Sequence, residues 1–92
     1  MKILLSPQRS NNIIGYSFGK DKIIVKYNNK IDTFDFFDMP NGRLEADKIK
    51  TKLDINPIIS AERKEGVLYV ELINFIGVNA TEEERFPSWK EV

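Results

Sequence analysis

The sequence contains neither cysteine nor histidine. Without cysteine the chain forms no disulfide, and it offers no thiolate nucleophile, cysteine zinc site or iron–sulfur cluster. Without histidine it lacks the Ser-His-Asp and Cys-His catalytic arrangements, histidine metal ligands and the usual acid or base of neutral pH. We therefore expect a protein that is not an enzyme and that binds no cofactor or metal. The lack of cysteine also fits a reducing cytoplasm.

Long apolar runs and a surplus of charge are absent as well. The apolar stretch before Pro7 is shorter than the roughly 7–15 residues of a secretory signal. No run approaches the roughly 18 apolar residues of a membrane helix. The 14 basic and 14 acidic residues cancel, so no net field attracts the chain to nucleic acid or to an anionic membrane. We expect no membrane partner, and we expect protein partners rather than nucleic acid.

What the sequence does contain is typical of one small globular domain. Its 92 residues are 41% hydrophobic, 30% charged and 11% aromatic, which argues against a disordered chain. Isoleucine is the commonest residue, and β-branched side chains favour strands. The composition therefore indicates a small β-rich fold.

Apolar runs in the first half of the chain predict strands at 3–5, 12–18, 22–27 and 31–37. Three-residue turns rich in Gly, Asp and Asn separate the last three of these strands, which predicts an antiparallel meander. Alternation along the third strand places Ile23, Val25 and Tyr27 on one face, so we expect Tyr27 in the core. Pro7 is expected to end the first strand.

The second half of the chain predicts one short helix between strands. Ala46, Ile49 and Leu53 share a helical face, so residues 43–53 are expected to form a helix of about two to three turns. The remaining strands are expected at 58–63 and 67–75. The predicted fold class is mainly β (α+β): a small antiparallel sheet, meander or partly open barrel with one short helix.

The predicted domain spans residues 1–76, and residues 77–92 lack periodicity and are expected to form an extended C-terminal arm. Burying an aromatic ring contributes roughly 1.5–3 kcal/mol, so Phe86 and Trp89 are costly to leave in water. We expect both rings to enter pockets on an apolar strip, either of the arm's own sheet or of a second copy in a homo-oligomer. The acidic run of the arm is then expected near the basic first hairpin: Glu82, Glu83 and Glu84.

The hairpin 20–30 combines Lys20, Lys22 and Lys26 with aromatic neighbours. Two interpretations stay open. The lysines line the solvent face of a strand and protect it from edge pairing, or they bind single-stranded nucleic acid in a small barrel whose aromatic rings stack on bases. The aromatic candidates are Tyr16, Phe18 and Tyr27.

Four aspartates follow or lie within the predicted meander: Asp32, Asp35, Asp38 and Asp54. They indicate either a solvated strand edge or a weak cation site. Alternation places Asp32 and Asp35 on opposite faces, and the spacing of a calcium loop is absent. A carboxylate-based hydrolase also needs a substrate-sized groove, for which a chain of this length leaves little room.

Four segments resemble, in the same order, a family of small phage and prophage proteins encoded near tail and tail-fibre genes. These segments are 1–9, 34–36 with 39–42, 66–72 and 79–87. The last, Asn-Ala-Thr-Glu-Glu-Glu-Arg-Phe-Pro, is the most specific, since the family ending reads Asn-Ala-Pro-Glu-Glu-x-x-Phe-Pro. Thr81 thus stands where a proline is usual. The likeness covers most of the chain.

The resemblance implies a non-enzymatic accessory or structural protein that acts in tail-region assembly. Its partners would be phage structural or assembly proteins, in the cytoplasm of the bacterial host or in the virion, and it brings no catalytic residue. The alternative function is a single-stranded nucleic-acid-binding module that uses the basic hairpin. From the residues themselves, the predicted contacts lie on the arm and the hairpin: Phe86, Trp89, Glu82, Glu83, Glu84, Lys20, Lys22 and Lys26.

Overall fold

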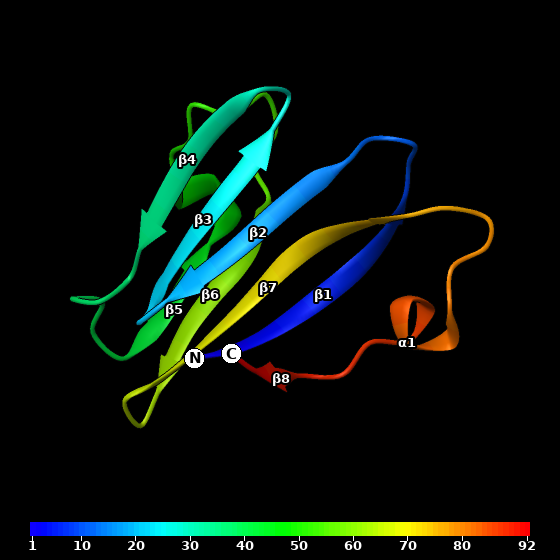
Figure 1. Cartoon of the computed structure of the whole chain (residues 1–92). Coiled ribbons are helices and arrows are strands. Elements are labelled where there is room, and N and C mark those ends of the chain that lie inside the picture. Colours follow the sequence, from blue (N-terminus) through cyan, green and yellow to red (C-terminus); the bar gives the residue numbers. More distant parts are fainter.

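Eight strands form two sheets in the computed structural model, which describes all of residues 1–92 (Figure 1). The protein is mostly β, with 53% of its residues in strands and 8% in helices, as the sequence predicts. One sheet has the strand order β5-β6-β7-β1-β8 and the other β2-β3-β4, and they do not close into a barrel. No helix of the structure has the length and apolar content to cross a membrane. The elements are β1 (Lys2–Arg9), β2 (Ile14–Gly19), β3 (Lys22–Tyr27), β4 (Lys30–Asp35), β5 (Gly42–Glu45), a 3₁₀ turn (Ala46–Lys48), β6 (Ile58–Lys64), β7 (Val67–Ile76), α1 (Glu82–Arg85) and β8 (Lys90–Glu91).

The three-stranded sheet is the antiparallel meander that the alternation predicts. β3 lies in its centre and pairs with β2 on one side and β4 on the other. The turns use residue types that tolerate left-handed backbone, since Asp21 and Asn28 have φ angles of 49° and 51°. Ile23, Val25 and Tyr27 are buried, which confirms the core prediction for β3.

β1 brings the N-terminal strand into the middle of the five-stranded sheet. It pairs in parallel with β7, with Lys2 opposite Tyr69, whereas all other strand pairs are antiparallel. A parallel pair requires a long crossover between its strands. Here the crossover contains the whole meander, which is how the meander comes to lie over the five-stranded sheet (Figure 1).

The prediction that Pro7 ends the first strand is wrong, because β1 continues to Arg9. Ser10 donates its backbone N–H to the carbonyl of Ile76 on β7. Successive residues of a strand turn their backbone groups to opposite sides, so the nitrogen of Pro7 faces away from β7. β8 pairs with β1 only at Lys2 and Ile3, and a proline is tolerated where no neighbouring strand needs its N–H.

Residues 43–53 form no α-helix, contrary to the prediction. The first three of these residues, 43–45, belong to β5, which pairs with β6. Only the 3₁₀ turn Ala46–Lys48 follows. The carbonyl of Ala46 accepts the backbone N–H of Ile49 at 3.0 Å, which closes the 3₁₀ turn, and it also accepts the side-chain amide of Asn56 at 2.9 Å. Leu53 is nonetheless buried in the core. The apolar residues of this segment thus contribute to the core from an irregular stretch that follows an edge strand, not from a helix.

The core lies between the two sheets. Its buried side chains come from both sheets and from the irregular segment: Ile3, Ile23, Val25, Tyr27, Phe34, Phe36, Leu53, Ile58, Ala61, Leu68, Val70 and Leu72. The hydroxyl of Tyr16 on β2 donates to the carbonyl of Ile73 on β7 and so links the sheets. Burial raises the pKa of Tyr16 above its ordinary value.

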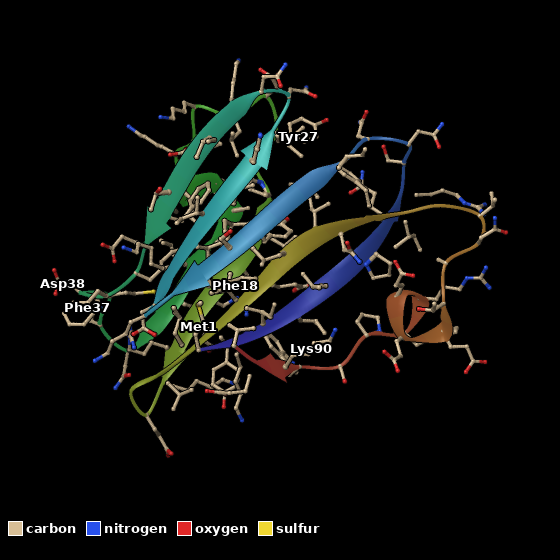
Figure 2. All side chains as sticks on the ribbon, in the orientation of Figure 1. Met1, Phe18, Tyr27, Phe37, Asp38 and Lys90 are labelled. Carbon is tan, nitrogen blue, oxygen red and sulfur yellow. The ribbon has the colours of Figure 1, made fainter.

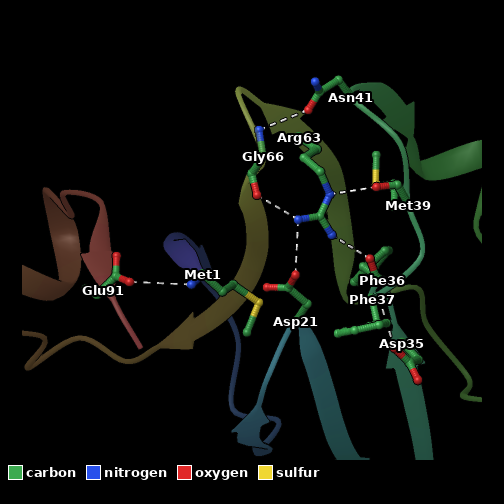
Figure 3. Close-up of polar contacts among 10 residues, drawn as sticks. All are labelled: Met1, Asp21, Asp35, Phe36, Phe37, Met39, Asn41, Arg63, Gly66 and Glu91. Carbon is green, nitrogen blue, oxygen red and sulfur yellow. Dashed lines mark hydrogen bonds and ion pairs between the residues drawn. The ribbon is translucent and has the colours of Figure 1, made fainter.

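Arg63 on β6 joins three turns at one corner of the molecule (Figure 3). Its side chain is only 10% exposed and forms an ion pair with Asp21, with Nη1 3.1 Å from Oδ2. The guanidinium also donates to the carbonyls of Phe36, Met39 and Gly66 at 2.7, 2.6 and 2.9 Å. The planar fork of donors on arginine suits this arrangement. These contacts connect the β2–β3 turn, the segment after β4 and the β6–β7 turn.

Candidate interaction surfaces

The arm, residues 77–92, begins with a locally specified helical turn. In α1, Thr81 Oγ1 accepts a hydrogen bond from the backbone N–H of Glu84, and Glu84 Oε1 accepts one from that of Thr81. Arg85 donates to the carbonyl of Val78 at 3.0 Å. The predicted extended arm therefore contains a short helix that its lack of periodicity did not indicate. The missed signal was the Thr-x-x-Glu spacing of a capping box.

β8 attaches the end of the arm to the chain's own sheet. It pairs antiparallel with the start of β1, and Val92 donates its N–H to the carbonyl of Met1 at 3.0 Å. The ring of Trp89 meets the ring of Tyr69 edge to face, with 5.5 Å between centroids and 85° between planes. In this single chain the end of the arm thus lies on its own sheet, and pairing with a second copy stays a prediction.

Phe86 lies between α1 and β8, and neither element covers its ring. Its side chain is 79% exposed, and Val78 before α1 is 69% exposed. The expectation that both aromatic rings of the arm enter pockets is wrong for Phe86, and Trp89 is still 46% exposed despite its contact with Tyr69. The arm therefore presents an aromatic ring to solvent from a segment that is held on both sides.

The acidic run of the arm does not meet the basic hairpin. α1 contains Glu82, Glu83 and Glu84 and contacts β1 and β7. None of the ion pairs within 4.0 Å joins one of these glutamates to a lysine of the hairpin. The expected pairing is wrong, because Glu84 instead caps its own helix and α1 lies along the far side of β1 (Figure 1).

The basic and the aromatic side chains of the hairpin lie on opposite faces of the meander. Tyr16 and Phe18 are directly opposite the buried side chains of β3 and stack on each other, with centroids 6.2 Å apart. Lys22 and Lys26 alternate with those buried residues and face outward. A platform that stacks bases between lysines is therefore not formed.

Lys20 differs from the other two lysines because it lies in the turn between β2 and β3. Its Nζ is 5.7 Å from the centre of the ring of Phe37, within the range of a cation–π contact. Figure 2 shows Phe37 and Asp38 on the loop after β4, at the periphery of the molecule. None of the hairpin lysines Lys20, Lys22 and Lys26 has an ion pair within 4.0 Å.

Asp32 blocks the outer edge of β4. Phe36 donates its N–H toward β3, to the carbonyl of Asp21, so alternation turns the N–H of Thr33 away from β3. That N–H donates to Asp32 Oδ1, while Oδ2 accepts from Thr51 Oγ1 and from a neighbouring backbone N–H. Partial burial raises the pKa of Asp32, but these hydrogen bonds outweigh burial and leave the pKa below its ordinary value.

Asp54 and Asp35 also serve local contacts, whereas Asp38 forms no hydrogen bond or ion pair with another side chain. Asp54 accepts hydrogen bonds from Lys30 Nζ at 2.7 Å and from Asn28 at 3.2 Å, and the contact with Lys30 lowers the pKa of Asp54. Asp35 accepts from the N–H of Phe37 at 3.0 Å. No group of three or more acidic side chains is placed to hold a metal ion.

The outer edge of β2 carries no such block. The alternation that points Phe36 toward β3 leaves the backbone groups of Ile14, Tyr16 and Phe18 facing away from β3. No strand and no side chain forms a hydrogen bond with these groups. β2 has six residues, whereas the outer strands of the other sheet, β5 and β8, have four and two.

Two hollows border the meander. One, of about 510 Å³, lies beside β4 and is lined mostly by apolar side chains such as Phe34 and Leu44. The other, of about 600 Å³, lies at the start of β2 and is mostly polar. Gly15 and Lys26 line the polar hollow together with the amide groups of several asparagines, which are Asn11, Asn12, Asn28 and Asn29.

Comparison of the chain with protein-family models, with curated proteins and with solved structures found no match. The surfaces that remain as candidates for binding are the arm around Phe86, the open edge of β2 and the two hollows. Each has to be interpreted from its own chemistry.

Proposed function

We propose that the protein is a non-enzymatic accessory or structural protein of a phage or prophage, which acts in tail-region assembly through protein–protein contacts. The phage and tail context rests on the sequence resemblance. The observation that supports action through protein contacts is the exposure of Phe86 on an arm that is ordered on both sides.

Phe86 fits a protein contact because of both its exposure and its fixed position. Aromatic rings are enriched among the residues that dominate interfaces. The capping box of α1 and the pairing of β8 already order the segment, so a partner does not have to restrict a flexible chain when it covers the ring. Covering it would contribute roughly 1.5–3 kcal/mol.

The acidic side chains add support for a role without catalysis. Asp32 and Asp54 each accept hydrogen bonds from two or more neighbours, and lowered pKa values keep both ionised. A general acid needs a carboxyl group whose pKa is raised toward neutral pH. Neither aspartate has that property.

The test is co-sedimentation with phage particles and their assembly intermediates from an induced culture. We expect the protein to sediment with one of these fractions, and Phe86→Ala to remain in the supernatant. Phe37→Ala is the matched control, because it removes another exposed ring from a distant loop, and it should sediment normally. A wild-type protein found only free of particles and intermediates would contradict the proposal.

The alternative, a single-stranded nucleic-acid-binding module, has less support because the lysines and rings of the hairpin face opposite ways. Fluorescence anisotropy with labelled single strands distinguishes the two functions. We expect no micromolar binding at low salt. Tight binding that weakens steeply as salt is added would favour the alternative, since phosphate contacts release counterions.

A further inference from the structure

The open edge of β2 lies beside uncompensated positive charge. Lys22 and Lys26 face outward from β3 and have no ion pair within 4.0 Å. Asp35, which is directly opposite Lys22 on β4, is also beyond that distance. The residue opposite Lys26 on β4 is the uncharged Ile31. Both lysines are therefore available to an external carboxylate.

Glycines on β2 let these lysines reach the edge. Lys26 is opposite Gly15, and Lys22 is opposite Gly19. A Cβ atom at Gly19 would lie 3.2 Å from Cε of Lys22, so this side chain already lies over β2 at Gly19. A strand added next to β2 would lie about 10 Å from β3, or two strand spacings. A lysine and a glutamate together span that distance when no side chain stands between them.

The polar hollow supplies a second, independent feature at the same edge. It lies over Gly15, where a Cβ atom would meet nothing within 4 Å, and Lys26 forms part of its wall. The amides of Asn11, Asn12 and Asn29 around it provide further hydrogen-bond donors, whereas that of Asn28 donates to Asp54. A hollow with one cation and several amide donors suits a carboxylate.

From these features we infer that the edge of β2 binds an extended acidic segment of another protein, which joins the meander as a fourth strand. Its backbone pairs with the free groups of Ile14, Tyr16 and Phe18, as in other cases of strand addition. Two carboxylates four residues apart face outward, one toward Lys26 in the hollow and one toward Lys22. The side chains between them that face inward are apolar, because they lie beside Tyr16 and Phe18.

Charge also argues against a second copy of the chain as the occupant. An antiparallel pair of β2 strands would bring the lysines of both copies toward one shared edge, where like charges repel. The inference rests on the proposed action through protein contacts, but it concerns a surface other than Phe86 and specifies the chemistry of the partner.

The test measures binding of a short synthetic peptide to the full-length protein. In the peptide, valines alternate with outward-facing Glu, Thr and Glu, and a matched peptide has Gln in place of both Glu. We expect the Glu peptide to bind about tenfold more tightly at low salt, as two partly exposed ion pairs would give. The double variant Lys22→Gln with Lys26→Gln should remove that difference. The control variant Lys48→Gln with Lys50→Gln changes two exposed lysines elsewhere and should retain it.

Amide hydrogen exchange locates the bound peptide. We expect the N–H groups of Ile14, Tyr16 and Phe18 to become protected when the Glu peptide binds. Equal binding of the two peptides, no binding, or protection at another strand would each overturn the inference. A single-stranded oligonucleotide that protects the same amides and displaces the peptide would overturn it in favour of a nucleic-acid site.

This result is separable from that for the proposed function. Phe86→Ala should bind the peptide normally, because Phe86 lies on the arm and not on the meander. If the peptide fails while Phe86→Ala still abolishes co-sedimentation, only the inference about β2 is wrong. If the peptide binds as expected but the wild-type protein never sediments with particles, only the phage assignment is wrong.

Discussion

The two outer strands of the meander, β2 and β4, differ in the polar contacts that cover their outer edges. On the β4 side, polar side chains connect the meander to its surroundings: Arg63 binds the segment that follows β4, and Asp32 fills the strand edge. On the other side, β2 itself is linked to the five-stranded sheet by the hydroxyl of Tyr16, and the strand edge is open. Exposed strand edges invite pairing with other chains, and proteins commonly block them. A protein that blocks one edge and leaves the other open has a surface suited to a partner.

The largest expected effect comes from the corner at Arg63. Arg63→Met should destabilise the protein by about 3 kcal/mol, because Asp21 loses its partner and three carbonyls lose a charged donor. Urea denaturation of the variant measures the loss. Arg43→Met is the control, since Arg43 pairs at the surface and such pairs contribute about 0–1 kcal/mol. Equal losses for both variants would mean that the corner does not fasten the β4 side.

Asp32→Asn tests the blocked edge directly. We expect a loss of about 1–2 kcal/mol at neutral pH, because the carboxylate accepts three hydrogen bonds. The pKa of Asp32 is lowered in the folded protein, so its stabilisation is present above the ordinary pKa of 3.8. It is lost as the pH falls through the lowered value. The stabilities of wild type and variant should therefore begin to converge as the pH falls below about 4 and meet below the lowered pKa; a difference that stays constant on acidification would contradict this account.

Tyr16→Phe removes the hydroxyl link on the β2 side. We expect a smaller loss of about 1 kcal/mol, since one neutral hydrogen bond is removed. The pKa of Tyr16 is raised in the folded protein, so its contribution is present below the ordinary pKa of 10.0. It is lost as the pH rises above that value. Denaturation curves from neutral to alkaline pH should show a steeper decline for wild type than for the variant. Identical slopes would indicate that the hydroxyl is not buried against Ile73.

The smallest effect is expected for Phe86→Ala. Because the ring is 79% exposed, its removal should change the free energy of unfolding by less than about 0.5 kcal/mol. Trp89→Ala is the useful contrast, since its edge-to-face contact with Tyr69 corresponds to about 0.5–1.5 kcal/mol. Thermal denaturation of both variants checks the order. A large loss for Phe86→Ala would show that the ring stabilises the fold and is not free for a partner.

Local patterns predicted those parts of the fold in which neighbours along the chain decide the structure. The meander follows from alternating apolar residues in β3 and from turn residues such as Asn28. The capping box of α1, from Thr81 to Glu84, was equally local and could have been found from the sequence. The sequence predicted cover for both Phe86 and Trp89; the contact of Trp89 with Tyr69 joins distant residues, and no local pattern indicates it.

Distant contacts decided the rest. The spacing of Ala46, Ile49 and Leu53 fits a helix. The residues just before Ala46 instead pair with the edge of β6 and form β5. Likewise, the parallel pairing of β1 with β7 joins residues that are nearly three quarters of the chain apart, such as Lys2 and Tyr69, which no local pattern encodes.

By itself, then, the sequence determined the class of fold, the buried face of β3 and the absence of cysteine and histidine chemistry, because composition and short-range alternation are sufficient for these. Only the tertiary structure decided which strand edges are blocked, which carbonyls Arg63 binds and that Lys22 lies over Gly19, next to an open strand edge. Each of these depends on which segments become neighbours after folding. That choice is made by the packing of the two sheets as a whole, since burial and hydrogen-bond satisfaction are properties of the assembled fold.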